Sequence, residues 1–204
     1  NGVKKDQLED KGILNNKIST LIYEYLIKNG VKTHWIETLN EREQLCKKVE
    51  IVPLEVIIRN RATGSFVKKY GAEEGKIFKN PTFELSYKND DLGDPLLNDD
   101  HALALELVSA EELKEIKEQT FLINKLLSEI FDKMNLILVD FKIEFGRDKD
   151  GNILLADEIS PDSMRLWDKD TLKKLDKDRF RQDLGDVMGA YREVLRRLEK
   201  ALAE

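Results

Sequence analysis

The segment from Leu136 to Gly146 alternates charged and apolar residues, and it restricts the fold more than any other part of the chain. In a β-strand this alternation puts Asp140, Lys142 and Glu144 on one face. Phe141, Ile143 and Phe145 then lie on the opposite face, which we expect to pack against a hydrophobic core. A turn over residues 146–151 and a returning strand over residues 152–158 complete a predicted hairpin.

The predicted hairpin carries acidic residues on both strands. A register with Glu144 opposite Asp157 would bring their Cβ atoms to about 5 Å. Two carboxylates this close repel each other unless a cation lies between them, and such oxygen ligands suit Mg²⁺ that carries nucleotide phosphates. The alternative is a solvated outer face of a hairpin, and this segment alone leaves both interpretations open.

Three further segments have the three- and four-residue spacing of apolar residues that is typical of helices. The first runs from Asn15 to Lys28 and is stopped by Asn29-Gly30. The second begins at Ser109, where Ser109 and Glu112 form a predicted capping box, and continues to about Lys133. The third is terminal and includes Leu184, Val187, Met188, Tyr191, Leu195 and Leu198. We interpret these helices as core-packing elements.

β-Branched residues predict strands over residues 31–37 and 54–61, with a break at Val52-Pro53. The region from Lys48 to Pro53 is a candidate hinge between two lobes. Residues 89–100, rich in Asp, Asn, Gly and Pro, are the best candidate for a long loop.

Charge and cysteine content limit the partners of the chain. With 34 Lys+Arg against 40 Asp+Glu the net charge is -6, and without a long basic run we expect no nucleic-acid partner. Cys46 is the only cysteine, which excludes an internal disulfide and fits a reducing cytoplasm. No apolar stretch reaches the ~20 residues that span a bilayer, so we expect no membrane partner. The chain begins Asn1-Gly2-Val3 without Met, and we expect the natural protein to start earlier.

Two segments combine arginines with small or acidic residues. Arg59 and Arg61 precede the turn Ala62-Thr63-Gly64-Ser65, whose backbone N–H groups suit a bound anion, although a solvent-facing edge is the alternative. Residues 160–165 offer Arg165 for a phosphate or carboxylate and Asp162 for ribose hydroxyls, unless this is a surface loop. Lys88 suits a phosphate or a surface position. No Walker or Rossmann glycine motif is present.

Several long segments together resemble the phosphoribosylaminoimidazole-succinocarboxamide (SAICAR) synthase family. Residues 51–65 (IVPLEVIIRNRATGS) resemble its first signature, and residues 138–146 (LVDFKIEFG) resemble the second. The pattern also covers residues 10–17, 88–90, 157–162 and 178–182, which extends it through nearly the whole chain. Members of this family begin with a short strand pair whose Gly-Lys-x-Lys segment covers the nucleotide. No segment of this sequence corresponds to it.

The resemblance implies a two-lobed α+β fold related to ATP-grasp and kinase-like proteins, with ATP between antiparallel sheets. Residues 1–49 would belong to the ATP-binding lobe, and residues 50–204 would form the catalytic lobe with C-terminal helices. For the nucleotide, the resemblance implies that Glu50 and Ile51 contact adenine and that Glu144 and Asp157 hold Mg²⁺. The implied ribotide-binding residues are Arg59, Ser65, Asp162, Arg165 and Arg181, and the implied catalytic residues are Lys142 and Asp140. A mobile loop would carry Lys88, which binds the nucleotide, and Asp94, which binds substrate.

The implied activity is an ATP- and Mg²⁺-dependent ligation in purine biosynthesis. Carboxyaminoimidazole ribotide (CAIR) would be activated as an acyl phosphate, and the amine of L-aspartate would attack it to form an amide. The resemblance also implies a cytoplasmic homodimer. Two alternatives remain: a kinase-like phosphotransferase, although no His-Arg-Asp catalytic loop is present, and a non-catalytic ribotide-binding module.

Overall fold

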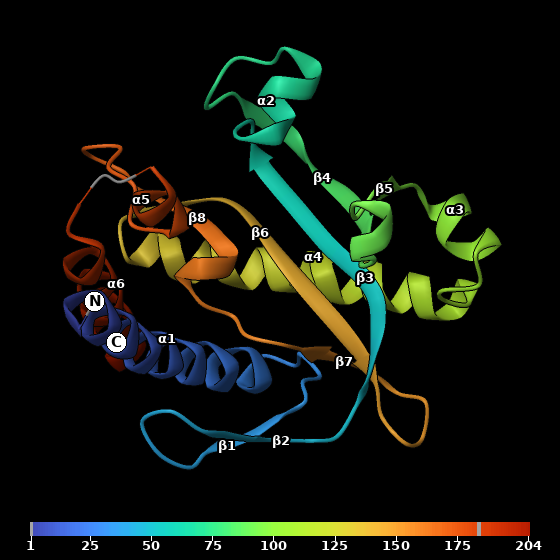
Figure 1. Cartoon of the computed structure of the whole chain (residues 1–204), viewed down its shortest axis with the longest axis horizontal. Coiled ribbons are helices and arrows are strands. Elements are labelled where there is room, and N and C mark those ends of the chain that lie inside the picture. The colour runs from blue at the N-terminus through green and yellow to red at the C-terminus, as the bar shows by residue number, and fades with distance from the viewer. Residues whose placement is uncertain (1, 183–184) are drawn as a thin grey trace.

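The computed structural model describes the backbone of residues 2–182 and 185–204, and the side chains of residues 10–179, 181–182 and 185–204. Helices and strands are mixed along the chain (Figure 1). The helices are α1 (Gly2–Lys28), α2 (Ser65–Tyr70), η1 (Asp90–Leu92), α3 (Asp99–Ala104), α4 (Ala110–Lys133), η2 (Pro161–Ser163), α5 (Lys177–Arg181) and α6 (Val187–Ala203). The strands are β1 (Trp35–Thr38), β2 (Gln44–Cys46), β3 (Glu50–Arg61), β4 (Ile77–Tyr87), β5 (Leu96–Leu97), β6 (Leu136–Arg147), β7 (Ile153–Ala156) and β8 (Met164–Asp168).

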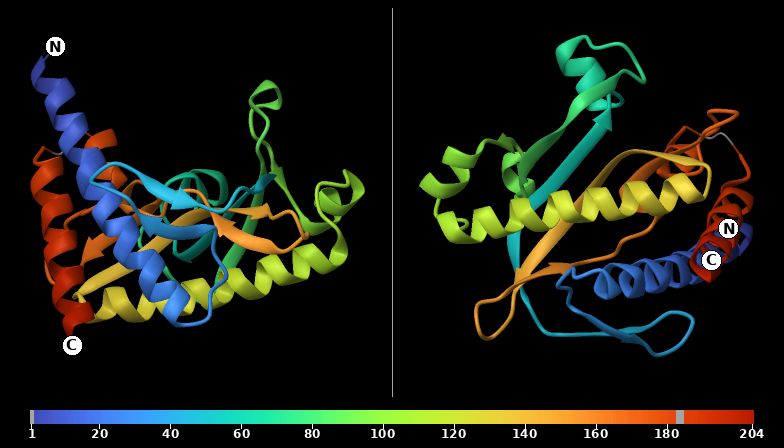
Figure 2. Two further views of the ribbon diagram at one scale, coloured as in Figure 1. Left: turned by 90° about the horizontal axis from the view of Figure 1, so that it is seen from below. Right: turned by 180° about the vertical axis from the view of Figure 1, so that it is seen from behind.

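The described strands form one large antiparallel sheet and one small one. The large sheet has the order β5-β4-β3-β6-β7, and β8 pairs with the other part of β6. Strands β1 and β2 make the two-stranded sheet. Helix α4 runs across one face of the large sheet, and α1 and α6 lie side by side at one end of it (Figures 1 and 2). This mixture of helices and antiparallel sheets confirms the predicted α+β fold.

Strand β6 is central because it pairs with β3 along one edge and with β7 and β8 along the other. Its apolar face carries Phe141, Ile143 and Phe145, which are buried in the hydrophobic core as the alternation predicts. The same core includes Ile18 of α1 and Tyr191 of α6. Residues on both sides of the predicted lobe boundary at 49/50 therefore share one core, and that boundary stays a prediction.

The predicted helices are present. Helix α1 includes residues 15–28 and extends back to Gly2, and Gly30 follows it with a positive φ of 94°. At the start of α4, Ser109 Oγ accepts from the Glu112 N–H at 3.1 Å, and the Glu112 carboxylate accepts from the Ser109 N–H at 2.9 Å. This is the predicted capping box. Helix α6 begins at Val187, and Leu184 lies outside the described residues.

The predicted break at Val52-Pro53 is wrong. Strand β3 continues through both residues, and its pairing with β6 shifts register between Ile51 and Glu55. Proline lacks an N–H donor, and this irregular stretch of the ladder accommodates it. The Pro53 carbonyl still accepts from the Lys88 N–H at 2.9 Å, which connects β3 to the end of β4.

The predicted loop over residues 89–100 is partly regular structure. It contains η1, the short strand β5 and the start of α3. The Asn89 side chain caps η1 by accepting from the Leu92 N–H at 3.2 Å. His101 belongs to the capping box at the start of α3, where its Nδ1 accepts from the Asn98 N–H at 3.2 Å. His101 is therefore part of a helix cap.

Candidate active site

A cavity of about 370 Å³ lies where β3, β6, β8, α2 and α5 meet, and most of its polar lining is basic. We call it the basic cavity. Its lining includes the predicted residues Arg59, Ser65, Asp140, Lys142, Arg165 and Arg181, and also Lys68 and Lys177. The structure therefore brings together side chains from four distant parts of the sequence. A concentration of cations in a hollow of this kind suits a phosphorylated or carboxylated ligand.

Asp140 holds the two central arginines of the basic cavity. Arg165 Nη1 donates to Asp140 Oδ2 at 2.9 Å, and Arg59 Nη1 lies 3.9 Å from the same oxygen. Burial raises the pKa of Asp140, and the nearby Arg165 guanidinium opposes that shift. Both guanidinium groups thus contact one carboxylate oxygen of Asp140, which helps to fix their positions.

Further contacts orient each guanidinium. Arg59 Nε donates to Glu84 at 2.6 Å, and Arg59 Nη2 donates to Ser65 Oγ at 3.1 Å. Arg165 Nε donates to Asp178 at 2.7 Å. Gly64 lies directly against Arg165, since a Cβ at this position would be 2.8 Å from Nη2. Its φ of 57° is also in the left-handed region that favours glycine.

Lys68 and Lys177 line the basic cavity but were absent from the predicted site. Burial, followed by the nearby Arg165 guanidinium, lowers the pKa of Lys177 to about 8. Lys177 directly precedes residues 178–182, which carry part of the family resemblance. This position in the sequence could have indicated that Lys177 belongs to the site. Lys68 had no comparable indication, because it lies in α2 among other exposed lysines.

Farther along the same face of β6, Glu144 and Asp157 meet Lys88 in what we call the carboxylate cluster. Lys88 Nζ donates to both Glu144 oxygens, at 3.0 and 2.9 Å. The hydrogen-bonded Glu144 carboxylate raises the pKa of Lys88, and Asp157 adds to this effect. Glu144 is only 6% exposed, so this negative charge is largely removed from water. Lys142, between Asp140 and Glu144 on the strand, contacts Glu55 at 3.4 Å.

The predicted register of the hairpin is wrong by one residue. Glu144 pairs with Ala156, and Asp157 follows the last residue of β7 with a left-handed φ of 65°. Sequence alternation defines the faces of each strand but not which residues pair across them, and a shift by one reverses the faces. The left-handed turn redirects the chain at Asp157, so Glu144 and Asp157 both still raise the pKa of Lys88.

The carboxylate cluster fits a hard cation. Lys88 already brings a positive charge to Glu144, and carboxylate oxygens are the ligands that Mg²⁺ prefers. Among residues 2–182 and 185–204, no three His, Cys, Asp or Glu side chains are arranged to hold a metal ion.

Glu50 and Ile51 lie at the start of β3, where they pair with Arg147 and Gly146 of β6. The pairing of β3 with β4 begins only at Leu54. Within the described residues, no strand pairs with the second edge of β3 at Glu50 and Ile51. The contact with adenine that the resemblance implies for these two residues stays a prediction.

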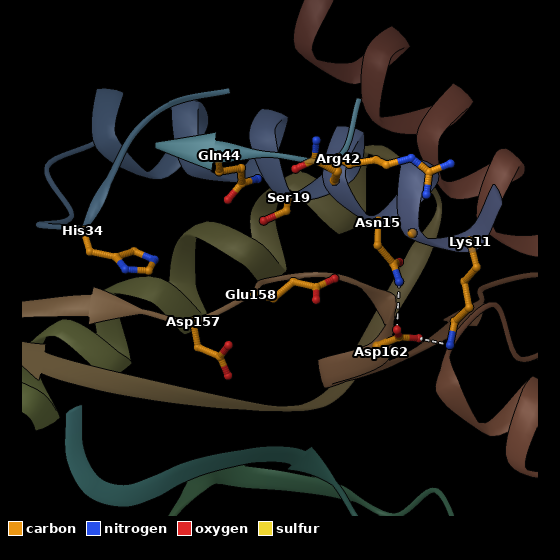
Figure 3. Close-up of a pocket in the computed structure, with 11 residues that line it drawn as sticks. Lys11, Asn15, Ser19, His34, Arg42, Gln44, Asp157, Glu158 and Asp162 are labelled. Atoms are coloured by element: carbon orange, nitrogen blue, oxygen red, sulfur yellow. Dashed lines mark hydrogen bonds and ion pairs between the residues drawn. The ribbon is translucent and has the colours of Figure 1, made fainter. Parts of the chain in front are cut away.

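A second cavity, of about 530 Å³, lies between α1 and the connection from β7 to η2 (Figure 3). We call it the polar cavity. Asp162 is held here: its carboxylate accepts from Asn15 Nδ2 at 2.8 Å and from the Tyr191 hydroxyl at 2.6 Å, and Lys11 Nζ lies 3.0 Å away. His34 also lines this cavity, and burial lowers its pKa.

Two predicted substrate residues lie outside the basic cavity. Asp162 lines the polar cavity. Asp94 lies in the turn before β5, where its carboxylate accepts from the Asn89 N–H at 2.8 Å. Lys88, predicted on the same loop, lies at the end of β4 in the carboxylate cluster. The three sites nevertheless share structural elements. Strand β6 carries Asp140 of the basic cavity and Glu144 of the carboxylate cluster, and Asp157 belongs to both the carboxylate cluster and the polar cavity.

Known proteins share both this sequence and this architecture. A family model described as SAICAR synthetase matches residues 1–198. A phosphoribosylaminoimidazole-succinocarboxamide synthase of Finegoldia magna is 61% identical over 198 residues, covering 97% of this chain and 85% of that protein. The chain belongs to the SAICAR synthetase family.

Solved structures of SAICAR synthetases have the same fold. The phosphoribosylaminoimidazole-succinocarboxamide synthase from Ehrlichia chaffeensis matches with a TM-score of 0.91 and 49% identity, covering 93% of this chain and 81% of that one. A SAICAR synthetase (Type-2) in complex with ADP matches with a TM-score of 0.89 and 44% identity, covering 92% and 80%. The resemblance inferred from the sequence is thereby confirmed.

Proposed function

We infer that this chain is an ATP-dependent ligase of purine biosynthesis, which condenses CAIR with L-aspartate to give SAICAR, ADP and phosphate. The observation that carries this conclusion is membership of the SAICAR synthetase family over residues 1–198, with curated relatives near 60% identity. The basic cavity and the carboxylate cluster share strand β6, and the carboxylate cluster and the polar cavity share Asp157, which is consistent with a reaction that joins three substrates.

The basic cavity is the proposed ribotide site. Arg59 and Arg165 are held by Glu84, Asp140 and Asp178, so their remaining N–H groups are fixed in direction before a ligand arrives. Such preorganised guanidinium groups bind phosphate or carboxylate oxygens with two parallel hydrogen bonds. Ser65, Arg181, Lys68 and Lys177 would complete this anion site, and Lys142 would lie near the reacting carboxylate.

The carboxylate cluster is the proposed place of phosphoryl transfer. Glu144 and Asp157 would hold Mg²⁺, which neutralises charge on the phosphates of ATP. Lys88 already contacts Glu144. It would bind a phosphate oxygen of ATP once a metal ion occupies its present position. Glu50 and Ile51 would meet adenine through the backbone at the unpaired edge of β3. Asp94, in the turn before β5, would contact a substrate.

The proposed chemistry has two steps. An oxygen of the CAIR carboxylate attacks the γ-phosphorus of ATP, the bond to the bridging oxygen breaks, and ADP leaves. The aspartate amine then attacks the acyl carbon, loses a proton and expels inorganic phosphate, which leaves an amide. Asp140 keeps Arg59 and Arg165 in place, and Lys142 offsets the negative charge that develops on the acyl oxygen when the amine attacks.

The lobes, the assembly and the location of the enzyme are also proposals. We propose a nucleotide lobe formed by residues 1–49, a catalytic lobe formed by residues 50–204, a homodimer, and a cytoplasmic enzyme. The described residues contain no helix long and apolar enough to cross a membrane. Cys46 is a free cysteine, which is compatible with a reducing compartment.

A coupled assay of ADP release tests the proposed function. With CAIR, L-aspartate and ATP all present, we expect steady ADP formation and an equal amount of SAICAR. Omitting either CAIR or L-aspartate should reduce ADP release to background. Release that persists without L-aspartate, with a phosphorylated product, would instead indicate a kinase-like phosphotransferase.

A further inference from the structure

Asp176 is a buried carboxylate that takes no part in the proposed chemistry. The residue is 0% exposed. Its two oxygens accept from backbone N–H groups of two different elements: Oδ2 accepts from Leu166 of β8 at 2.7 Å, and Oδ1 accepts from Asp178 of α5 at 2.8 Å. A carboxylate that is removed from water is costly unless it is hydrogen-bonded. These two bonds satisfy both oxygens and connect α5 to β8.

Helix α5 depends on this connection for its position. The chain returns beside β8 just before the helix, where the Leu175 N–H donates to the Leu166 carbonyl at 2.9 Å. The Asp176 carbonyl then accepts from the Arg179 N–H at 3.1 Å. Helix α5 has five residues, which is too short for a helix to be stable by itself. The side chain of Asp176 therefore helps to define where α5 begins and how close it lies to β8.

Both elements that Asp176 connects carry residues of the basic cavity. Lys177 and Arg181 of α5 line this cavity, and so does Arg165 of β8. Asp178, which is 5% exposed, accepts from Arg165 Nε at 2.7 Å. A shift of α5 away from β8 would separate this ion pair and move two cations out of the cavity.

The environment of Asp176 favours a functional role over a purely stabilising one. Burial raises the pKa of Asp176 to about 7, and the hydrogen bonds from the Asp178 and Leu166 N–H groups oppose that shift. A buried charge of this kind contributes little net stability compared with a neutral residue that fills the same space. Ionisable residues kept in such environments cluster at functional sites.

We propose that Asp176 is a positioning residue for the basic cavity: by holding α5 against β8, it places the cations of α5 beside Arg165. Asp176 does not itself line the cavity, so it acts through these neighbours. The identity of the ligand as CAIR rests on the proposed function. The role of Asp176 in placing α5 does not.

Asp176→Asn tests this role with almost no change in side-chain volume. An amide has one oxygen, so asparagine can accept from Leu166 or from Asp178 but cannot offer an oxygen to each. The KM for CAIR should rise about tenfold, as is usual for coupling within one hydrogen-bond network. The KM values for ATP and L-aspartate should stay unchanged.

Asp168→Asn is the matched control. Asp168 is 7% exposed, ends β8, and accepts from the Asp170 and Thr171 N–H groups at 2.9 and 3.0 Å. It also pairs with Arg197, and it does not line the basic cavity. Its replacement should lower the melting temperature and leave the KM for CAIR unchanged. An equal KM for CAIR in this variant and in Asp176→Asn would overturn the proposal.

A coupled set of variants tests whether Asp176 acts through α5. In a chain that carries Lys177→Met and Arg181→Met, α5 has lost its cations in the basic cavity. Asp176→Asn should then raise the KM for CAIR by less than about threefold, because residues that act as one unit are not additive. A further tenfold rise in this background would contradict a role through α5.

Amide hydrogen exchange gives a reading on the unchanged chain, without turnover. CAIR, or inorganic phosphate as a simpler probe of the basic cavity, should slow exchange at the Leu166 and Asp178 amides about tenfold, because local opening of α5 then competes with binding. The Asp170 and Thr171 amides serve as the internal reference and should change little. Equal slowing at all four amides, or slowing at none, would overturn the proposal.

The outcomes distinguish this inference from the proposed function. If no SAICAR forms but CAIR or inorganic phosphate slows exchange at Leu166 and Asp178, the positioning role stands without the reaction. If turnover is normal and Asp176→Asn leaves the KM for CAIR unchanged, the positioning role is wrong and the reaction stands.

Discussion

Lys88 Nζ donates to both carboxylate oxygens of Glu144, at 3.0 and 2.9 Å. The two residues come from the end of β4 and from β6, 56 positions apart in the sequence. A buried carboxylate in this position requires a cation, and the lysine supplies one. A Mg²⁺ ion held by Glu144 and Asp157, as we propose, would compete with Lys88 for the oxygens of Glu144.

Glu144→Gln and Asp157→Asn should each reduce turnover at least about a hundredfold while the fold is kept. Each change removes one negative charge from the proposed metal site with almost no change in side-chain volume, and the metal supplies several kcal/mol of charge stabilisation. The measurement is kcat over a range of Mg²⁺ concentrations, with the melting temperature as a check on folding. A near wild-type rate at limiting Mg²⁺ for either variant would refute the metal assignment.

Arg59→Lys and Arg165→Lys should weaken ribotide binding and leave ATP binding nearly unchanged. Lysine keeps the charge but loses the planar pair of donors, and a hydrogen bond to a charged group is worth ~1.5–3 kcal/mol. The KM for CAIR should therefore rise roughly ten- to hundredfold. Arg197→Lys is the control, because Arg197 pairs with Asp168 and Glu193 and does not line the basic cavity. Equal shifts for ATP and CAIR would contradict the assignment.

Gly64→Ala should impair the ribotide site through Arg165. The added methyl group would lie 2.8 Å from Arg165 Nη2, so the guanidinium has to move. Gly71→Ala is the control for a left-handed glycine without a close neighbour: its φ of 63° and ψ of 24° cost an alanine ~1–2 kcal/mol, and nothing lies within 4 Å. Thermal unfolding should show a larger loss for Gly64→Ala, because Gly64 has a φ of 57° and a ψ of -130°, outside the left-handed helical region. Only Gly64→Ala should raise the KM for CAIR, and equal KM values would argue against a positioned Arg165.

Lys177 should make ribotide binding sensitive to pH. Its pKa is lowered to about 8, and an anionic ligand binds best to the protonated amine. The KM for CAIR should therefore increase as the pH rises from 7 to 9, because the free chain loses this proton in that range. Lys177→Met should have a higher KM at pH 7 and a flatter profile above it. An identical slope in the variant and the wild-type chain would exclude Lys177 as the titrating group.

The sequence predicted what depends on local periodicity and on residue type. The two faces of β6, the capping box at Ser109 and the arginine segment around Arg59 follow from spacing alone. The residue that pairs with Glu144 could not be predicted in this way, because strand register and the left-handed turn at Asp157 depend on tertiary packing. The polar cavity was also missed, since Asn15 and Ser19 look like ordinary polar positions of an amphipathic helix until Asp162 is brought opposite them.

The central claim is that ATP activates the CAIR carboxylate for attack by the aspartate amine. The most direct test uses CAIR labelled with ¹⁸O in that carboxylate, followed by mass analysis of the products. The account predicts that one labelled oxygen appears in each inorganic phosphate released and that the amide of SAICAR retains the other. Release of unlabelled phosphate, or ADP formation without SAICAR, would contradict it.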